Sequence, residues 1–91
     1  MKIVINGCFG GFSLSDIAVK VLGLQSSYSY IDRTDERLIA LVEACSDTAS
    51  GSFSNLRVVE IPDSATDWEI EEYDGLESII AVVDGKLVHI A

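Results

Sequence analysis

The sequence predicts an α+β fold in which two helices pack on one face of a small, mainly antiparallel sheet of about four to five strands. Three observations lead to this class. A strand pattern opens the chain, two amphipathic helical patterns follow, and β-rich runs separated by short turns complete it. With 91 residues the chain can form one core but not two, so we expect a single domain over residues 1–91.

The N-terminal part predicts one strand and one helix. Residues 2–6 are apolar on both faces of a strand, which is typical of a central position in a sheet. After a glycine-rich interruption, apolar side chains recur at helical spacing. We therefore expect a helix over about 14–23 that starts at Ser13 or Ser15 and ends at Gly23.

The middle of the chain predicts a loop and a second helix. Residues 25–31 are polar and aromatic and indicate a loop or a short edge segment. Thr34 is expected to cap the helix, because carboxylates follow it in the first turn. The apolar stripe consists of Leu38, Leu41, Val42, Cys45 and Ala49. This spacing places Cys45 in the core and predicts an end by Ser50-Gly51.

The C-terminal part predicts strands. The β-rich runs cover residues 56–61, 67–72, 78–83 and 86–90. Asp84-Gly85 joins the last two, and a two-residue loop of this composition is a strong signal of a hairpin. In that register Ile80 faces His89, and Val82 faces Leu87.

The net charge of −9 is concentrated in one part of the chain. Residues 58–91 carry nine acidic side chains and one basic side chain, whereas residues 1–57 carry six and five. This excess of carboxylates disfavours direct binding of nucleic acid, whose phosphates it would repel. The apolar runs are too short to span a membrane, and no signal peptide is recognisable. The two cysteines suit neither a disulfide framework nor a metal site, so we expect a cytoplasmic protein.

The acidic part of the chain is the first candidate binding site. Its carboxylates, with no basic residue among them, belong to Glu60, Asp63, Asp67, Glu69, Glu71, Glu72, Asp74 and Glu77. The residues that we expect to contact a basic surface of a partner protein are Glu69, Glu71, Glu72, Tyr73, Asp74 and the loop tyrosines Tyr28 and Tyr30. The alternatives are a solvated face that protects a sheet edge, or a Ca²⁺ or Mg²⁺ site, for which EF-hand spacing is missing.

The glycine-rich turn is the second candidate. Gly7, Cys8, Gly10 and Gly11 lie between a strand and a helix, where backbone N–H groups can bind an anion. Their spacing matches neither a dinucleotide-binding fingerprint nor a P-loop, and a tight turn explains them equally well. Cys8 would need a base to act as a nucleophile, and His89 is the sole histidine. A buried structural thiol is the alternative.

A polar cluster, Asp32-Arg33-Thr34-Asp35, precedes the second helix. We expect it to serve helix entry, with Arg33 and Arg37 pairing with neighbouring acids. A polar binding site is the alternative.

Several segments between residues 2 and 75 form an ordered set. They are Lys2-Ile3-Val4-Ile5-Asn6, Cys8-Phe9-Gly10-Gly11-Phe12-Ser13-Leu14-Ser15, Ile31-Asp32-Arg33-Thr34-Asp35, Val58-Val59-Glu60-Ile61-Pro62-Asp63 and Trp68-Glu69-Ile70-Glu71-Glu72-Tyr73-Asp74-Gly75. Together they resemble a widespread family of short uncharacterised phage and prophage proteins. The resemblance implies a viral context and supplies neither an activity nor a cofactor. Residues 79–90 depart from the short basic and aromatic tail that is usual in the family, so a role of that tail is not carried over.

These observations favour a non-enzymatic binding protein without catalytic residues, metal or cofactor. We expect a phage or mobile-element protein that inhibits or modulates a host protein in the host cytoplasm, of the anti-CRISPR or another anti-defence type. A nucleic-acid-binding effector is one form of the target. The second hypothesis is a nucleotide-signal binder that uses the glycine-rich turn, and the third is a small thiol enzyme that uses Cys8. A homodimer is compatible with a core of this size.

Overall fold

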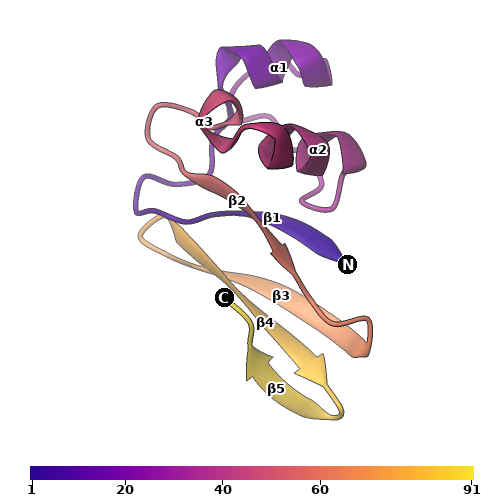
Figure 1. Cartoon of the computed structure of the whole chain (residues 1–91). Helices are drawn as coiled ribbons and strands as arrows, with labels where there is room; N and C mark the ends of the chain where they lie inside the picture. The colour runs from indigo at the N-terminus through magenta and orange to yellow at the C-terminus, as the bar shows by residue number, and fades with distance from the viewer.

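Three helices and five strands form the fold, which confirms the predicted α+β class (Figure 1). The computed structural model describes residues 1–91. In chain order the elements are β1 (Lys2–Asn6), α1 (Asp16–Leu22), α2 (Glu36–Ala44), α3 (Ser46–Ala49), β2 (Leu56–Glu60), β3 (Ala65–Tyr73), β4 (Leu76–Val83) and β5 (Lys86–His89). All strand pairs are antiparallel. None of the helices has the length and apolar character required to cross a membrane.

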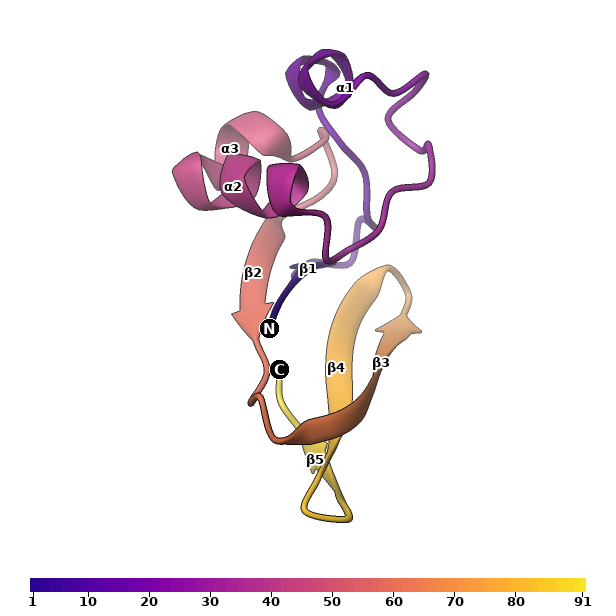
Figure 2. The ribbon, with the colours of Figure 1, turned by 90° about the vertical axis from the view of Figure 1, so that its right-hand side faces the viewer.

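The strands divide between two sheets, whereas the sequence predicted one. β1 pairs with β2, and β3, β4 and β5 form a second sheet in that order. Figures 1 and 2 show three successive layers, which are the helices, the β1–β2 sheet and the three-stranded sheet. The helices cover one face of the β1–β2 sheet, and the three-stranded sheet covers the other. β1 is apolar on both faces because its sheet is the middle layer of the domain.

Each face of the β1–β2 sheet belongs to a separate core, so the expectation of one core is wrong, because this middle sheet divides the interior of the domain in two. Val4 points toward the helices, whereas Ile3 and Ile5 point toward the three-stranded sheet, because successive side chains of a strand alternate between its faces. The helix-side core contains Val4, Leu14, Ala18, Leu22, Ile31, Leu38, Val42, Ala49 and Leu56. The sheet-side core contains Ile3, Ile5, Val59, Ile61 and Ile79.

α1 is shorter than the helix predicted over 14–23. It begins after Ser15, whose hydroxyl oxygen accepts a hydrogen bond from Ala18 N at 3.0 Å. It ends at Gly23 as predicted, and Gly23 has a φ of 70°, which glycine adopts without strain. Leu14 lies outside the helix because it forms an antiparallel bridge with Ser50.

Asp35 caps α2, and not Thr34 as the sequence predicted. The Asp35 carboxylate accepts hydrogen bonds from the backbone N–H groups of Arg37 and Leu38 at 2.8 and 3.2 Å. The side chain of Arg37 and these N–H groups together hold the pKa of the Asp35 carboxyl below its ordinary value. The Asp35 carboxylate therefore provides hydrogen-bond acceptors for the backbone N–H groups in the first turn of α2.

The prediction that Cys45 lies in the core is wrong, because this residue is exposed. Its backbone is extended, with φ of −163° and ψ of 100°, so α2 ends at Ala44 and the predicted helix breaks in two. Ser46 then starts α3, and its hydroxyl donates a hydrogen bond to the Leu56 carbonyl. Ala49 returns to the core beyond the break.

Both hairpins of the three-stranded sheet turn on an Asp-Gly pair. The predicted turn at Asp84-Gly85 is confirmed, and Ile80 faces His89 as expected. Asp74-Gly75 forms the other turn, with φ of 51° and 90°. The sequence carries the same Asp-Gly signal there. β3 ends at Tyr73 and β4 begins at Leu76, so both strands reach the turn, whereas the sequence predicted strands over 67–72 and 78–83.

Candidate partner-binding surface

β3 carries most of the predicted partner-binding residues and forms one edge of the three-stranded sheet. Glu69, Glu71 and Tyr73 lie on one face of β3 and are exposed. Trp68 and Ile70 lie on the opposite face and pack against the sheet-side core. The alternation predicted for this strand is therefore confirmed.

A row of exposed carboxylates follows β3 and its turn, and we call this row the acidic edge. It consists of Asp67, Glu69, Glu71, Glu72 and Asp74. None of the ion pairs of the molecule involves these residues. Asp67 accepts a hydrogen bond from Trp68 N, and Glu72 accepts one from Gly75 N, both at 2.8 Å. The acidic edge thus presents negative charge to solvent with local backbone contacts alone.

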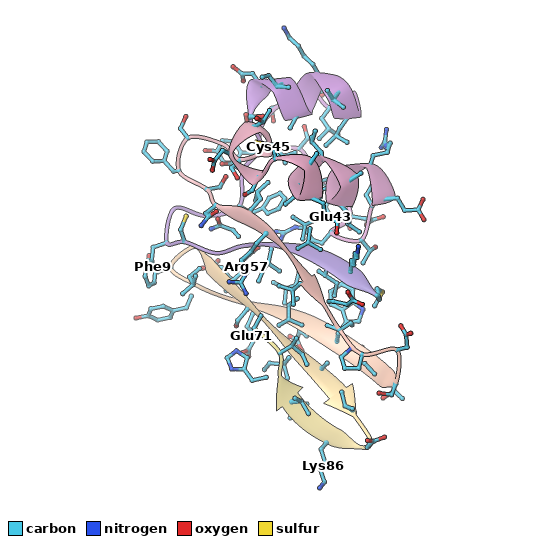
Figure 3. All side chains as sticks on the ribbon, in the orientation of Figure 1. Phe9, Glu43, Cys45, Arg57, Glu71 and Lys86 are labelled. Carbon is cyan, nitrogen blue, oxygen red and sulfur yellow. The ribbon has the colours of Figure 1, made fainter.

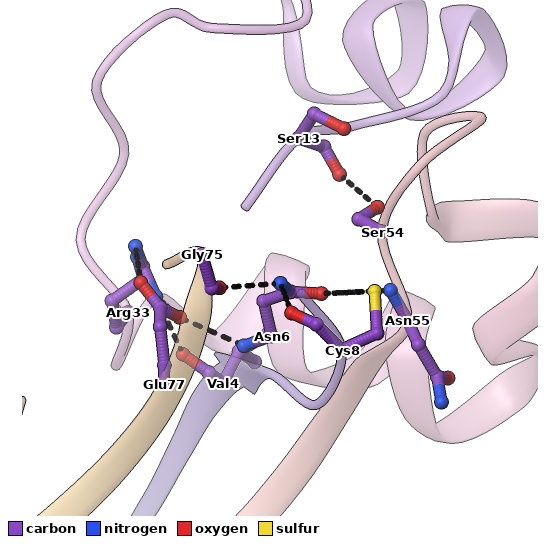
Figure 4. A network of polar contacts seen from close by, with 9 residues as sticks. All are labelled: Val4, Asn6, Cys8, Ser13, Arg33, Ser54, Asn55, Gly75 and Glu77. Atoms are coloured by element: carbon purple, nitrogen blue, oxygen red, sulfur yellow. Dashed lines mark hydrogen bonds and ion pairs between the residues drawn. The ribbon is translucent and has the colours of Figure 1, made fainter. Parts of the chain in front are cut away.

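Glu77 does not belong to this surface, although the sequence placed it among unpaired acids. Its side chain is 7% exposed and forms a bidentate ion pair with Arg33, with N···O distances of 2.7 and 2.8 Å (Figure 4). The guanidinium also stacks over Phe12, 3.6 Å from the ring centroid. Arg33 therefore pairs with an acid 44 residues away, and the prediction of a neighbouring partner holds only for Arg37, which contacts Asp35 at 3.4 Å.

The Arg33–Glu77 pair covers the edge of β1 that does not pair with β2. Val4 N donates to the Arg33 carbonyl at 2.9 Å, and the Arg33 guanidinium donates to the Val4 carbonyl at 3.2 Å. Glu77 Oε1 also accepts a hydrogen bond from Asn6 N at 2.7 Å. Because β2 pairs with one edge of β1 only, these contacts satisfy backbone groups that burial would otherwise leave without partners. The ion pair is structural and joins the middle layer to the three-stranded sheet.

Asn6 is a fully buried polar residue that no sequence motif singled out. Its amide nitrogen donates to the carbonyls of Cys8 and Gly75 at 2.6 and 2.8 Å, and its amide oxygen accepts from Asn55 N at 2.8 Å (Figure 4). The side chain thereby connects the glycine-rich turn, the β3–β4 turn and the segment before β2. The signal in the sequence is a short amide side chain between a buried strand and a glycine.

Gly7 and Gly10 allow close packing against the segment before β2, whereas Gly11 is favoured by its φ of 89°. A Cβ on Gly10 would lie 1.5 Å from the Phe53 carbonyl oxygen, so only glycine fits there. Gly7 N donates to the Asn55 carbonyl at 2.8 Å. These internal contacts support the interpretation of residues 7–11 as a tight turn, and they account for the glycines without an anion.

Cys8 contacts two neutral acceptors. Its thiol lies 3.2 Å from the Phe53 carbonyl oxygen and 3.5 Å from Asn6 Oδ1. His89 is exposed on β5 and lines a hollow of ≈ 550 Å³ together with Arg57 and Glu71, the last two labelled in Figure 3. The contacts of Cys8 support a structural thiol and not a nucleophile activated by histidine.

Tyr28 and Tyr30 line a groove of ≈ 580 Å³ between the loop that precedes α2 and β3. Both rings are exposed, and Trp68 and Ile70 form the opposite wall. The Tyr30 hydroxyl donates to Asp32 Oδ1 at 2.6 Å, and this hydrogen bond raises the pKa of the Tyr30 phenol above its ordinary value. The structure thus brings the predicted tyrosines to β3, but to the face opposite Glu69, Glu71 and Tyr73.

The carboxylates do not converge on a metal site, because no group of three or more His, Cys, Asp or Glu side chains could hold one ion. No protein-family model, curated protein or solved structure matches this chain. The functional conclusion therefore rests on the acidic edge and the adjacent groove.

Proposed function

We propose that this chain is a non-enzymatic binding protein of a phage or mobile element that inhibits or modulates a host protein through the acidic edge. An anti-defence inhibitor, for instance of the anti-CRISPR type, is the concrete form. The observation that supports the proposal is a row of exposed carboxylates on an edge strand, none of which forms an ion pair within the molecule. The resemblance to phage and prophage proteins supplies the viral context.

The charges of the acidic edge suit binding better than folding. Glu69 and Glu71 share one face of a strand, where Cα atoms two residues apart are spaced by about 6.8 Å. At this spacing their two like charges repel each other. Lysine and arginine side chains of a partner would replace this repulsion by attraction and accelerate association. We therefore expect a partner with a basic surface, such as a nucleic-acid-binding effector, in the cytoplasm of the host cell.

Affinity capture from infected or lysogenic host cells tests this proposal. The baits are the tagged chain, the variant E69Q/E71Q, and the control variant E36Q/D47N, which removes two exposed charges from α2 and α3. Glutamine and asparagine match the size of the acids they replace, so packing is preserved. We expect the wild type and the control to retain one host protein, and E69Q/E71Q to bind it about tenfold more weakly or worse.

The salt dependence of binding and the melting temperature distinguish a binding role of the acidic edge from a structural role. The affinity of the purified complex should fall with rising salt, because exposed charges are screened beyond about 10 Å at 0.1 M. The melting temperature of E69Q/E71Q should equal or exceed that of the wild type, since repulsion is relieved. Binding that responds neither to the double variant nor to salt would contradict the acidic-edge mechanism.

A further inference from the structure

The second edge of β3 is free. β3 pairs with β4 alone and forms the outer strand of its sheet. Figure 2 shows it on the same side of the molecule as the loop between α1 and α2. A free strand edge presents backbone N–H and C=O groups that another extended chain can pair with.

The register of the hairpin identifies the free backbone groups. Tyr73 and Leu76 flank the two-residue turn and face each other, which makes them a hydrogen-bonded pair. Bonding toward β4 alternates from there, so the backbone groups of Trp68, Ile70 and Glu72 point away from β4. Trp68 N points away from β4 as assigned but already donates to the Asp67 carboxylate at 2.8 Å, so Ile70 and Glu72 carry the free N–H groups.

The groove runs beside this free edge. The side chains of Trp68 and Ile70 form one wall, and Tyr28 and Tyr30 belong to the other. Its volume of ≈ 580 Å³ is of the size that accommodates a few side chains, and its lining is mainly hydrophobic. The groove thus offers an apolar and aromatic site for alternate side chains of a strand that pairs with β3.

Negative charge borders the same groove and edge. Asp32 lies in the groove lining, and the acidic edge follows the strand itself. Arg33 also lines the groove, but its guanidinium is held by Glu77. Pairing of β3 with the β3 of a second copy would bring two acidic edges together, which charge repulsion opposes. The complementary chain is basic.

We infer that the free edge of β3 and the adjacent groove receive an extended basic segment of the partner protein by strand addition, with Lys or Arg side chains alternating with apolar or aromatic ones. This inference rests on the proposed function, for which it names the binding mode and the chemistry of the partner. The apolar side chains enter the groove beside Trp68 and Ile70, and the cations meet the acidic edge.

N-methylated peptides test the binding mode. The probe is an acetylated and amidated peptide in which Lys alternates with Val and Tyr, of about eight residues to match the length of β3. Two further versions carry N-methyl groups on alternate residues, one version on the Lys positions and the other on the apolar positions. All three have the same side chains and the same charge. Strand addition uses the N–H groups of one alternate set only.

We expect the unmodified peptide to bind and one methylated version to bind about tenfold more weakly or worse, because methylation removes its bonds to β3. The other version should retain most of the affinity. Tyr30→Ala should weaken binding of the unmodified peptide several-fold, whereas Val21→Ala, a truncation of an exposed apolar side chain on α1 away from β3, should leave it unchanged. Both positions are exposed, so neither variant should affect folding.

Equal affinity of the two methylated versions would overturn strand addition, and so would a failure of the unmodified peptide to bind. If both methylated versions bind equally and E69Q/E71Q weakens both, the acidic edge acts by charge alone. In that case this inference fails and the proposed function stands. If the peptides show the expected asymmetry and the capture experiment yields no host protein, the groove is a peptide site and the proposed function fails.

Discussion

The two Asp-Gly turns have the same sequence and conformation but different surroundings. In both, the aspartate and the glycine have positive φ, 51° and 90° at Asp74-Gly75 and 52° and 76° at Asp84-Gly85. A Cβ on Gly75 would lie 2.4 Å from the Phe9 carbonyl oxygen and 2.6 Å from Gly11 N, whereas a Cβ on Gly85 would meet nothing within 4 Å. Figure 3 shows Phe9 near the first turn and Lys86 at the far end of the molecule.

The difference shows that a local signal specifies a turn and not its role in the fold. The Asp74-Gly75 end of the three-stranded sheet is docked against the rest of the domain. The Gly75 carbonyl accepts a hydrogen bond from Asn6, and the nearby Glu77 forms an ion pair with Arg33. The Asp84-Gly85 end has no such contacts and leaves β5 exposed. Substitutions at the two ends should therefore differ in their effect on stability.

Arg33→Met should have the largest effect and tests the docked end most directly. It leaves the Glu77 carboxylate buried without its cation, which typically costs about 3–5 kcal/mol of unfolding free energy. Urea unfolding followed by circular dichroism measures the loss. Arg37→Met, which breaks an exposed ion pair with Asp35, is the matched control and should change the free energy by about 0.5 kcal/mol or less. Equal effects of the two variants would show that burial of the pair is unimportant.

Gly75→Ala should follow, with a loss of about 3 kcal/mol. A left-handed conformation costs a non-glycine residue about 1–2 kcal/mol, and overpacking against backbone adds about 1–3 kcal/mol. The unfolding free energy, and the loss of hydrogen-exchange protection at Asn6 N, are the measurements. A wild-type melting curve would mean that the glycine-rich turn moves away at little cost.

Gly85→Ala is the comparison for Gly75→Ala and should cost about 1 kcal/mol, because it meets conformational strain without a steric clash. Gly85→Val should cost somewhat more, since branching at Cβ narrows the accessible conformations. The quantity to compare is the difference in unfolding free energy between the alanine variants at positions 75 and 85. If that difference vanishes, docking contributes nothing beyond the turn conformation.

Substitution of a thiol should have the smallest effect of these changes, but the two thiols should differ clearly in their rates of alkylation. Cys45 is exposed, and a hydrogen bond from the Thr48 hydroxyl to its sulfur lowers the pKa of its thiol, so more thiolate is present at a given pH. Alkylation by iodoacetamide should be faster at Cys45 than at Cys8, whose thiol donates a hydrogen bond to the Phe53 carbonyl. Cys8→Ser should leave host-protein binding within a few-fold of wild type. Faster alkylation of Cys8 in the native protein would indicate that the docked end opens.

Features that depend on neighbouring residues followed from the sequence. The end of α1 at Gly23, the Asp84-Gly85 hairpin and the alternation of Trp68 and Ile70 with acids along β3 each require a few consecutive residues. Glycine conformation and side-chain alternation act over that range, so the pattern carries the information.

Features that depend on docking could not be read from the sequence. In the sequence Glu77 looks like the acidic residues that precede it on β3 and its turn, and only its contact with Arg33, 44 residues away, removes it from the acidic edge. Asn6 finds its partners in three separate segments, and Cys45 leaves the core because the helix breaks after Ala44. The division into two sheets has the same origin. The alternation along each strand indicates which of its side chains are buried. The packing of the three layers determines which helix or sheet covers them.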